Sequence, residues 1–186
     1  MGPPGVGKGT QASSIAAHYG VPWVSSGDIF RDNIKRHTPM GERVVEIIGR
    51  GDFVPDVLTT ALVFQRLLEP DCRNGWLLDG YPRTVAQVEA LDLALGERHN
   101  QIAAALSLVA DADVLVRRMR HRAVIEGRPD DNEETIRHRL EVYRTETEPL
   151  TDLYRERGLL VEVDADGSIH EVRDRALDAL TAKLGR

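Results

Sequence analysis

The chain opens with the glycine-rich stretch Met1-Gly2-Pro3-Pro4-Gly5-Val6-Gly7-Lys8-Gly9-Thr10. In it, Gly2, Gly7 and Lys8 match the spacing G-x-x-x-x-G-K of a phosphate-binding loop, with Gly9-Thr10 in place of an immediate serine or threonine. Glycines let successive backbone N–H groups converge on phosphate oxygens, and the helix that follows points its positive end at them. The alternative is a glycine-rich turn with a chance lysine. The amphipathic pattern directly behind the loop favours a phosphate site.

Short apolar runs alternate with helical patterns along the rest of the chain. The expected strands are 22–25, 76–79, 102–110 and 159–164. The expected helices are 7–19, 27–36, 40–50, 56–68, 83–95, 113–122, 132–157 (bent at Pro149) and 169–184. Strands that alternate with helices predict a parallel β-sheet flanked by helices on both faces. Together with the loop, this pattern predicts an α/β fold of the P-loop NTPase type.

Two segments, 27–70 and 122–132, depart from this alternation. The first holds three helices in a row, and the second is polar and contains glycine and proline. Both are expected to be insertions at the rim of the sheet, where the carboxyl ends of parallel strands form ligand sites. The chain is therefore expected to be a single domain, 1–186, with a core of residues 1–26, 71–121 and 133–186.

Composition excludes several classes of protein. With 186 residues, 41% hydrophobic and 29% charged, the chain suits one globular domain and not a disordered or collagen-like protein. Its one cysteine, Cys72, can form neither an internal disulfide nor a cysteine-based metal site. A net charge of −6 argues against nonspecific nucleic-acid binding. No apolar run suits a membrane span and no heptad stands out, so we expect a cytoplasmic monomer.

Arginine dominates the basic residues: of 24, only Lys8, Lys35 and Lys183 are lysines. Nucleotide bias in the source genome is one explanation, and phosphate binding by the planar guanidinium is another. Position separates the two explanations. Arg117 and Arg137 have acids three or four residues away, which is typical of surface ion pairs.

Other arginines lack such partners. Arg118 and Arg122 lie four residues apart on one helix face, and neither Arg118 nor Arg139 has an acid at helical spacing. Three and four residues after Arg83 stand Ala86 and Gln87, and neither is an acid. Arg128, in the polar insertion, could equally be an exposed loop cation. Arginines of this kind on several elements around a phosphate loop predict a polyphosphate clamp.

Asp79 ends the apolar run Trp76-Leu77-Leu78, where a P-loop protein places the acid that holds Mg²⁺ through water. The alternative is a simple turn at Asp79-Gly80. None of the six histidines falls in a catalytic motif. That absence suits phosphoryl transfer to a phosphate, which needs positioning and charge neutralisation rather than a general base.

Four blocks, in order along nearly the whole chain, resemble the adenylate kinases. They are Gly2–Thr10 with Gln11; Ser25-Ser26-Gly27-Asp28 leading to Arg31; Leu78-Asp79-Gly80-Tyr81-Pro82-Arg83-Thr84 with Gln87; and Gly127-Arg128-Pro129-Asp130-Asp131-Asn132-Glu133-Glu134-Thr135 leading to Arg139. The D-G-Y-P-R-T block is far more specific than the phosphate loop alone. Ser26 stands where the family usually has threonine.

The resemblance implies a role for each candidate residue. The ATP site would be Gly5, Val6, Gly7, Lys8, Gly9, Thr10, Arg118 and, near the adenine, Gly167. The AMP site would be Ser26, Arg31, Asp52, Phe53, Val54, Gly80, Tyr81, Pro82, Arg83, Gln87, Arg128 and Arg139. Those acting on the transferred group would be Lys8, Arg83, Arg122, Arg128 and Arg139, with Asp79 on Mg²⁺ through water.

Two of these residues have simpler explanations. The Gln87 amide can pair a donor and an acceptor and so favours adenine, but Gln87 could be an exposed helix residue. Ser26 could serve only as a helix N-cap.

The activity that the resemblance implies is Mg·ATP + AMP ⇌ 2 ADP, without a covalent intermediate. Residues 27–70 would be the nucleoside-monophosphate-binding insertion and 122–132 the short form of the lid, with no zinc. The partners would be ATP, AMP and ADP. Two alternatives stay open: a kinase for another nucleoside monophosphate, and a nucleotide-binding module without turnover.

The start of the chain raises one further expectation. A phosphate loop follows a buried central strand, but only Met1 precedes Gly2. We therefore expect the natural chain to start upstream with a short apolar strand. A chain that begins at Met1 is expected to be marginally stable or inactive, because each lost buried side chain is worth about 1.5–3 kcal/mol.

Overall fold

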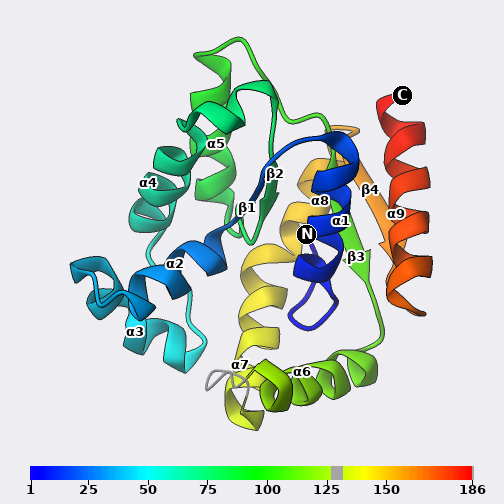
Figure 1. Cartoon of the computed structure of the whole chain (residues 1–186). Coiled ribbons are helices and arrows are strands. Elements are labelled where there is room, and N and C mark those ends of the chain that lie inside the picture. Colours follow the sequence, from blue (N-terminus) through cyan, green and yellow to red (C-terminus); the bar gives the residue numbers. More distant parts are fainter. Residues whose placement is uncertain (127–131, 186) are drawn as a thin grey trace.

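A computed structural model describes residues 1–126 and 132–185, with the backbone alone for 121–126 (Figure 1). The strands are β1 Trp23–Ser25, β2 Leu77–Asp79, β3 Ala105–Val109 and β4 Leu160–Asp164. The helices are α1 Lys8–Tyr19, α2 Ser26–Lys35, α3 Pro39–Arg50, α4 Asp56–Leu67, α5 Val85–Gly96, α6 Ala112–Glu126, α7 Glu133–Val142, α8 Pro149–Glu156 and α9 Ile169–Leu184. A 3-10 turn covers Pro70–Asn74, and a π-helical turn covers Tyr143–Thr147. The predicted α/β fold is confirmed.

The strands form two parallel pairs. β1 pairs with β2, with Val24 opposite Leu78, and β3 pairs with β4, with Ser107 opposite Glu162. Among the described residues β2 and β3 do not pair, so the expected single sheet is divided in two. Met1 bonds to the free edge of β3: its amine donates to the Leu106 carbonyl, and its carbonyl accepts from Leu108 N–H at 3.1 Å.

The larger apolar core lies around β3 and β4. Side chains from both strands, α1, α6, α7 and α9 meet there: Ile15, Leu108, Met119, Ile136, Val163, Val172 and Leu180. α1 contacts α9, β1 and β2, and its Ile15 lies in the same core cluster as Leu108 and Val163 (Figure 1). This packing fixes the helix that begins directly after the phosphate loop.

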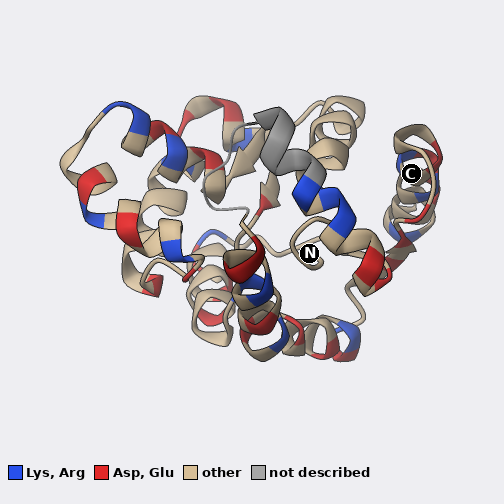
Figure 2. Ribbon diagram, turned by 90° about the horizontal axis from the view of Figure 1, so that it is seen from below, with Lys and Arg blue, Asp and Glu red and all other residues tan. Residues whose placement is uncertain are grey.

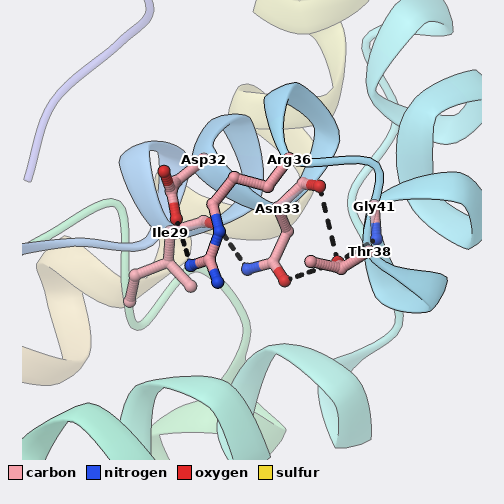
Figure 3. A network of polar contacts seen from close by, with 6 residues as sticks. All are labelled: Ile29, Asp32, Asn33, Arg36, Thr38 and Gly41. Atoms are coloured by element: carbon pink, nitrogen blue, oxygen red, sulfur yellow. Dashed lines mark hydrogen bonds and ion pairs between the residues drawn. The ribbon is translucent and has the colours of Figure 1, made fainter.

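Helices α2, α3 and α4 form one unit on the side of the molecule away from α9 (Figure 1), and α4 also packs against α5. They enclose their own apolar cluster around Phe30, Val44 and Val54. Figure 3 shows the corner between α2 and α3, where the Thr38 hydroxyl donates to Asn33 Oδ1 at 2.7 Å and accepts from Gly41 N–H at 3.1 Å. The unit has a core and a polar corner of its own.

The expected helix over 132–157 is instead three consecutive pieces, so its prediction as one bent helix is wrong in detail. α7 runs into the π-helical turn, in which Glu148 N–H donates to the Tyr143 carbonyl at 2.9 Å, and α8 begins at Pro149. Proline has no N–H and its ring crowds the preceding turn, so the helix changes its hydrogen-bond pattern before it. The buried Thr147 in this turn donates to the Arg83 carbonyl at 2.9 Å.

Candidate active site

The phosphate loop runs from Met1 directly into α1. Gly7 is the N-cap of α1 and has a φ of 102°, which side-chain-bearing residues rarely adopt. A Cβ on Gly2 would lie 2.4 Å from the Leu108 carbonyl oxygen, so the loop can lie against β3 only with glycine there. Lys8 Nζ donates to the carbonyls of Gly2 and Pro3 at 2.7 and 2.9 Å and is thus held within the loop. The predicted loop and helix are confirmed.

A cleft of about 720 Å³ opens at this loop. The predicted site residues that line it are Gly5, Val6, Gly7, Lys8, Gly9, Thr10, Arg31, Phe53, Asp79, Gly80, Tyr81, Pro82, Arg83, Arg118, Arg139 and Gly167. A second cavity, of about 80 Å³, adds Ser26, Asp52, Val54 and Gln87. Both cavities are lined by Arg31, Phe53, Gly80, Arg83 and Arg139. Two neighbouring cavities thus share a wall that carries three arginines.

Arg83 lies in that shared wall. Its Nε donates to the Gly80 carbonyl at 2.7 Å, and its guanidinium carbon lies 5.0 Å from the centre of the Phe53 ring. The pKa of Arg83 is lowered to about 10, mainly by burial and secondly by the positive charge of nearby Arg139. The side chain therefore remains a cation at neutral pH, in a place where a second cation already disfavours its charge. An anion between the two arginines would relieve that cost.

Gly80 and Ser26 line the smaller cavity beside Arg83. A Cβ on Gly80 would lie 2.7 Å from Ser26 Oγ and 2.9 Å from Arg83 Nη2, so glycine allows both side chains to converge. Ser26 Oγ donates to the Gly80 carbonyl at 2.7 Å. The N-cap of α2 is Ser25, whose Oγ accepts from Asp28 N–H at 3.2 Å. The N-cap explanation of Ser26 is therefore wrong.

Arg118 and Arg137 differ as their neighbours in the sequence predict. Arg118 donates to the carbonyls of Val6 and Ala165, at 3.2 and 3.0 Å, and lines the cleft. Arg137 pairs with Glu133 at 3.0 Å, and its side chain is 78% exposed. The surface ion pair predicted for Arg137 is confirmed. Arg31 lines both cavities and pairs with Asp28 at 2.6 Å.

Asp79 ends β2 and faces the phosphate loop. Its Oδ2 lies 3.7 Å from the position of a Cβ on Gly9, and the cleft that it lines also contains Thr10. A carboxylate and a hydroxyl are the oxygen donors that Mg²⁺ prefers, so these residues fit that ion. Within the part of the chain that the structure describes, no group of three His, Cys, Asp or Glu side chains could hold a metal ion.

Gln87 is 2% exposed, so its explanation as an exposed helix residue is wrong. Its Oε1 accepts from Arg83 N–H at 2.7 Å, and its Nε2 donates to Asp56 Oδ1 at 2.6 Å. The side chain lines the smaller cavity.

Comparisons with known proteins agree with this geometry. The family model described as adenylate kinase matches residues 1–159. The chain belongs to the adenylate kinase family. The adenylate kinase of Clavibacter michiganensis subsp. michiganensis is 54% identical over 183 residues, which cover 98% of this chain and 92% of that protein. The adenylate kinase of Thermobifida fusca is 50% identical over 183 residues, covering 98% and 97%, and that of Bifidobacterium longum is 49% identical over 180, covering 97% of each.

Two adenylate kinase site residues predicted from the sequence lie outside the described residues. They are Arg128 and the side chain of Arg122, and with them most of the predicted lid over 122–132. Their roles stay predictions.

Sequence reasoning missed residues that join distant parts of the molecule. Asp56, 31 positions from Gln87, and Thr147, 64 positions from Arg83, both bond to predicted site residues. His138 Nε2 lies 2.6 Å from Asp52 Oδ1, so this contact connects the α3–α4 loop to α7. The hydrogen bond from His138 is the largest cause that lowers the pKa of Asp52, and the hydrogen bond from Arg50 is the next. Asp56 stands at the start of a helix, where an acidic side chain is normally explained by its attraction to the positive end of the helix dipole. No local signal points to these partners.

Charged residues of both signs are mixed along the described helices. Figure 2 shows basic and acidic segments interspersed over the helices. No helix within the described ranges is long and apolar enough to span a membrane. Arg31, Arg83, Arg118 and Arg139 come together at the cleft.

Proposed function

We propose that this chain catalyses the reversible transfer of the γ-phosphoryl group of ATP to AMP, giving two ADP. The observation that carries the proposal is the pair of cavities that share a wall of arginines. One cavity is lined by the phosphate loop and the other by Ser26 and Gln87. Two nucleotides bound there would bring their phosphates together at Arg83.

On the ATP side, the backbone of the loop and the N-terminus of α1 bind the phosphates. Gly5, Val6, Gly7, Gly9 and Thr10 supply the loop, and Lys8 adds the positive charge. Arg118 holds the loop carbonyl of Val6 and the turn before α9, so it links the phosphates to the turn that contains Gly167.

On the acceptor side, AMP lies between α2 and the segment that follows β2. The residues that hold it are Ser26, Arg31, Asp52, Phe53, Val54, Gly80, Tyr81, Pro82, Arg83, Gln87, Arg128 and Arg139. Phe53 keeps Arg83 in place by packing against its guanidinium. Gln87 supplies both a donor and an acceptor to the base.

The transfer itself requires placement and charge neutralisation. The acceptor phosphate already carries its attacking oxygen as an anion, so no side chain has to remove a proton. Arg83 and Arg139 neutralise the charge on the transferred group from the shared wall. Arg122 and Arg128, in the segment proposed as the lid, complete this clamp and exclude water that would otherwise hydrolyse ATP.

Asp79, through water, and Thr10 would hold Mg²⁺, which would supply positive charge beside the ATP phosphates. We further propose a single monomeric, cytoplasmic domain in which residues 27–70 bind AMP and 122–132 form a short lid without zinc. Light scattering with and without nucleotides tests the monomer.

An acceptor screen tests the proposed activity. Purified 186-residue protein is given ATP with AMP, CMP, UMP or GMP, with Mg²⁺ or with a chelator, and ADP formation is followed. The expected result is Mg²⁺-dependent turnover with AMP at a kcat/KM well above those of the other acceptors. Preference for another acceptor would instead identify a sibling kinase. ATP binding without turnover would identify a binding module.

A further inference from the structure

The two ends of the Gln87 amide are held by partners of opposite hydrogen-bonding character. Arg83 N–H lies 2.7 Å from Oε1, and Asp56 Oδ1 lies 2.6 Å from Nε2. A backbone N–H can only donate, and an ionised carboxylate can only accept. Turning the amide over would set an N–H against an N–H and an oxygen against a carboxylate. The two partners therefore fix which end of the amide is oxygen and which is nitrogen.

Asp56 is itself held in place by a hydrogen bond to its second carboxylate oxygen. Its Oδ2 accepts from the Thr84 hydroxyl at 2.8 Å, and the same hydroxyl caps α5 by accepting from Gln87 N–H at 3.2 Å. Asp56 is the first residue of α4 and is not among the residues that line either cavity, whereas Gln87 lines the smaller one. Asp56 thus acts on a bound base only through the amide.

Each end of the amide keeps one unused hydrogen-bonding position. Oε1 has a second lone pair and Nε2 a second N–H, and the side chain that carries them lines the smaller cavity. A 6-aminopurine offers a donor at its exocyclic amine beside an acceptor at N1, and a 6-oxopurine offers an acceptor beside a donor. An amide free to turn over can pair with either base. A fixed amide pairs with only one of them once the ribose and phosphate set the direction of the ring.

We propose that Asp56 is a specificity-determining positioning residue: by fixing the Gln87 amide, it makes the acceptor site select a 6-aminopurine over a 6-oxopurine. The inference rests on the proposed function, because it assigns the smaller cavity to the base of the acceptor nucleotide. It explains a partly buried side-chain network that connects the first residue of α4 to the start of α5.

The test compares AMP with IMP, which carry the same ribose and phosphate and differ only at the 6 position and N1. In Asp56→Asn the side chain keeps its size but can donate as well as accept, so it no longer requires Nε2 to face it. Arg83 N–H is then the one of the two partners that still favours the original orientation. We expect the AMP-to-IMP ratio of kcat/KM to fall at least tenfold, through a higher KM for AMP and a gain with IMP. The kcat with AMP should stay within about threefold, because the hydrogen bonds lost do not touch the transferred group. Asp56→Ser, which can also donate and accept, should give a fall in the same direction.

Asp113→Asn is the matched control, because Asp113 is an exposed acid in the first turn of α6. It should leave the ratio unchanged. An unchanged ratio in both Asp56 variants, or equal losses with AMP and IMP, would overturn the proposal and leave Asp56 a structural role only. Calorimetric Kd values for AMP and IMP give the same ratio without turnover. Failure of the proposed function would appear separately, as an unmodified protein that forms no ADP from AMP.

Discussion

At the scale of single residues, the chemistry of the site depends on where cations are held without a carboxylate beside them. Arg83 is anchored by a carbonyl and an aromatic ring, and Arg118 by two carbonyls. Carbonyls orient a guanidinium but leave its charge to act on a ligand, whereas the carboxylate beside Arg137 neutralises that charge locally. Helical spacing to the nearest acid identified Arg137 and Arg118 from the sequence. It could not find Asp56 or His138, since their partners lie far along the chain.

Replacing Arg83 with alanine should separate catalysis from ATP binding. We expect kcat to fall by about 10²–10³-fold, because one charge that stabilises the transferred group is lost. The Kd for ATP, measured by calorimetry, should change only a few-fold, since the phosphate loop is intact. Arg137→Ala is the control and should alter kcat less than about twofold, because its ion pair is exposed. Equal damage from both variants would show that sorting arginines by their acidic neighbours is unsound.

At the scale of elements, the arrangement of the helices in the insertion α2–α4 depends on the short connections between them. α2 ends one short turn before the Thr38 N-cap of α3, and Asn33 bonds both to the Ile29 carbonyl and to Thr38 (Figure 3). The end of α3 could be predicted because Gly51 there has a left-handed backbone, as Gly20 has at the end of α1. The π-helical turn before Pro149 could not, because proline signals a bend but not how far upstream the hydrogen bonds rearrange.

Gly41→Ala should damage the insertion and hence acceptor binding. A Cβ at Gly41 would lie 2.2 Å from the Asn33 carbonyl oxygen, so α2 and α3 would have to separate. We expect a loss of about 1–3 kcal/mol in the free energy of unfolding and a raised KM for AMP, with the Kd for ATP unchanged. Calorimetric melting and initial-rate kinetics measure these quantities.

Gly49→Ala is the control for this prediction, because Gly49 lies in the same helix and a Cβ there meets nothing within 4 Å. It should raise stability by about 0.5–1 kcal/mol through helix propensity and leave the KM for AMP unchanged. If Gly41→Ala proved as harmless as this control, the α2–α3 corner would not be set by close backbone packing.

At the scale of the whole molecule, the proposed reaction requires the separate parts to close together. The insertion has its own apolar cluster, apart from the core around β3 and β4. It meets the rest of the molecule where α4 packs against α5, at the shared arginine wall, and at the contact between Asp52 and His138. The sequence predicted these parts from breaks in the alternation of strands and helices. How they pack against one another depends on contacts between distant residues.

A mimic that joins two adenosines through a chain of phosphates should slow hydrogen exchange in both 27–70 and 122–132. The phosphates attract arginines on either side, and closure buries backbone amides in both segments. ATP alone is the control and should protect the phosphate loop while 27–70 exchanges as before. Protection by the mimic that stayed confined to the phosphate loop would contradict closure.

The last prediction concerns the Met1 amine, which lies at the edge of β3. Met1 bonds to β3 where a strand could lie between β3 and β2, and burial lowers the pKa of its amine to about 5. An amine in an unfolded chain titrates near pH 8. Between these values the unfolded 186-residue chain binds a proton that the folded chain excludes, so the free energy of unfolding should fall as the pH drops from 8 to 5. The decrease should be on the order of a few kcal/mol, measured by denaturant titration at several pH values.

A short Val/Ile/Leu-rich extension before Met1 should remove this pH dependence and also stabilise the protein. The extension converts the amine into an amide, which carries no charge. Its backbone can continue the pairing of Met1 along β3, and its apolar side chains can be buried beside β2 and β3. A Gly/Ser extension of equal length is the control: it should abolish the pH dependence in the same way without the added burial. The melting temperature should therefore rise only with the apolar extension, by about 2–4 °C for each kcal/mol gained, and turnover should rise with it because the added strand supports the phosphate loop. If the apolar and Gly/Ser extensions melted at the same temperature and turned over equally fast, the edges of β2 and β3 would have no place for another strand.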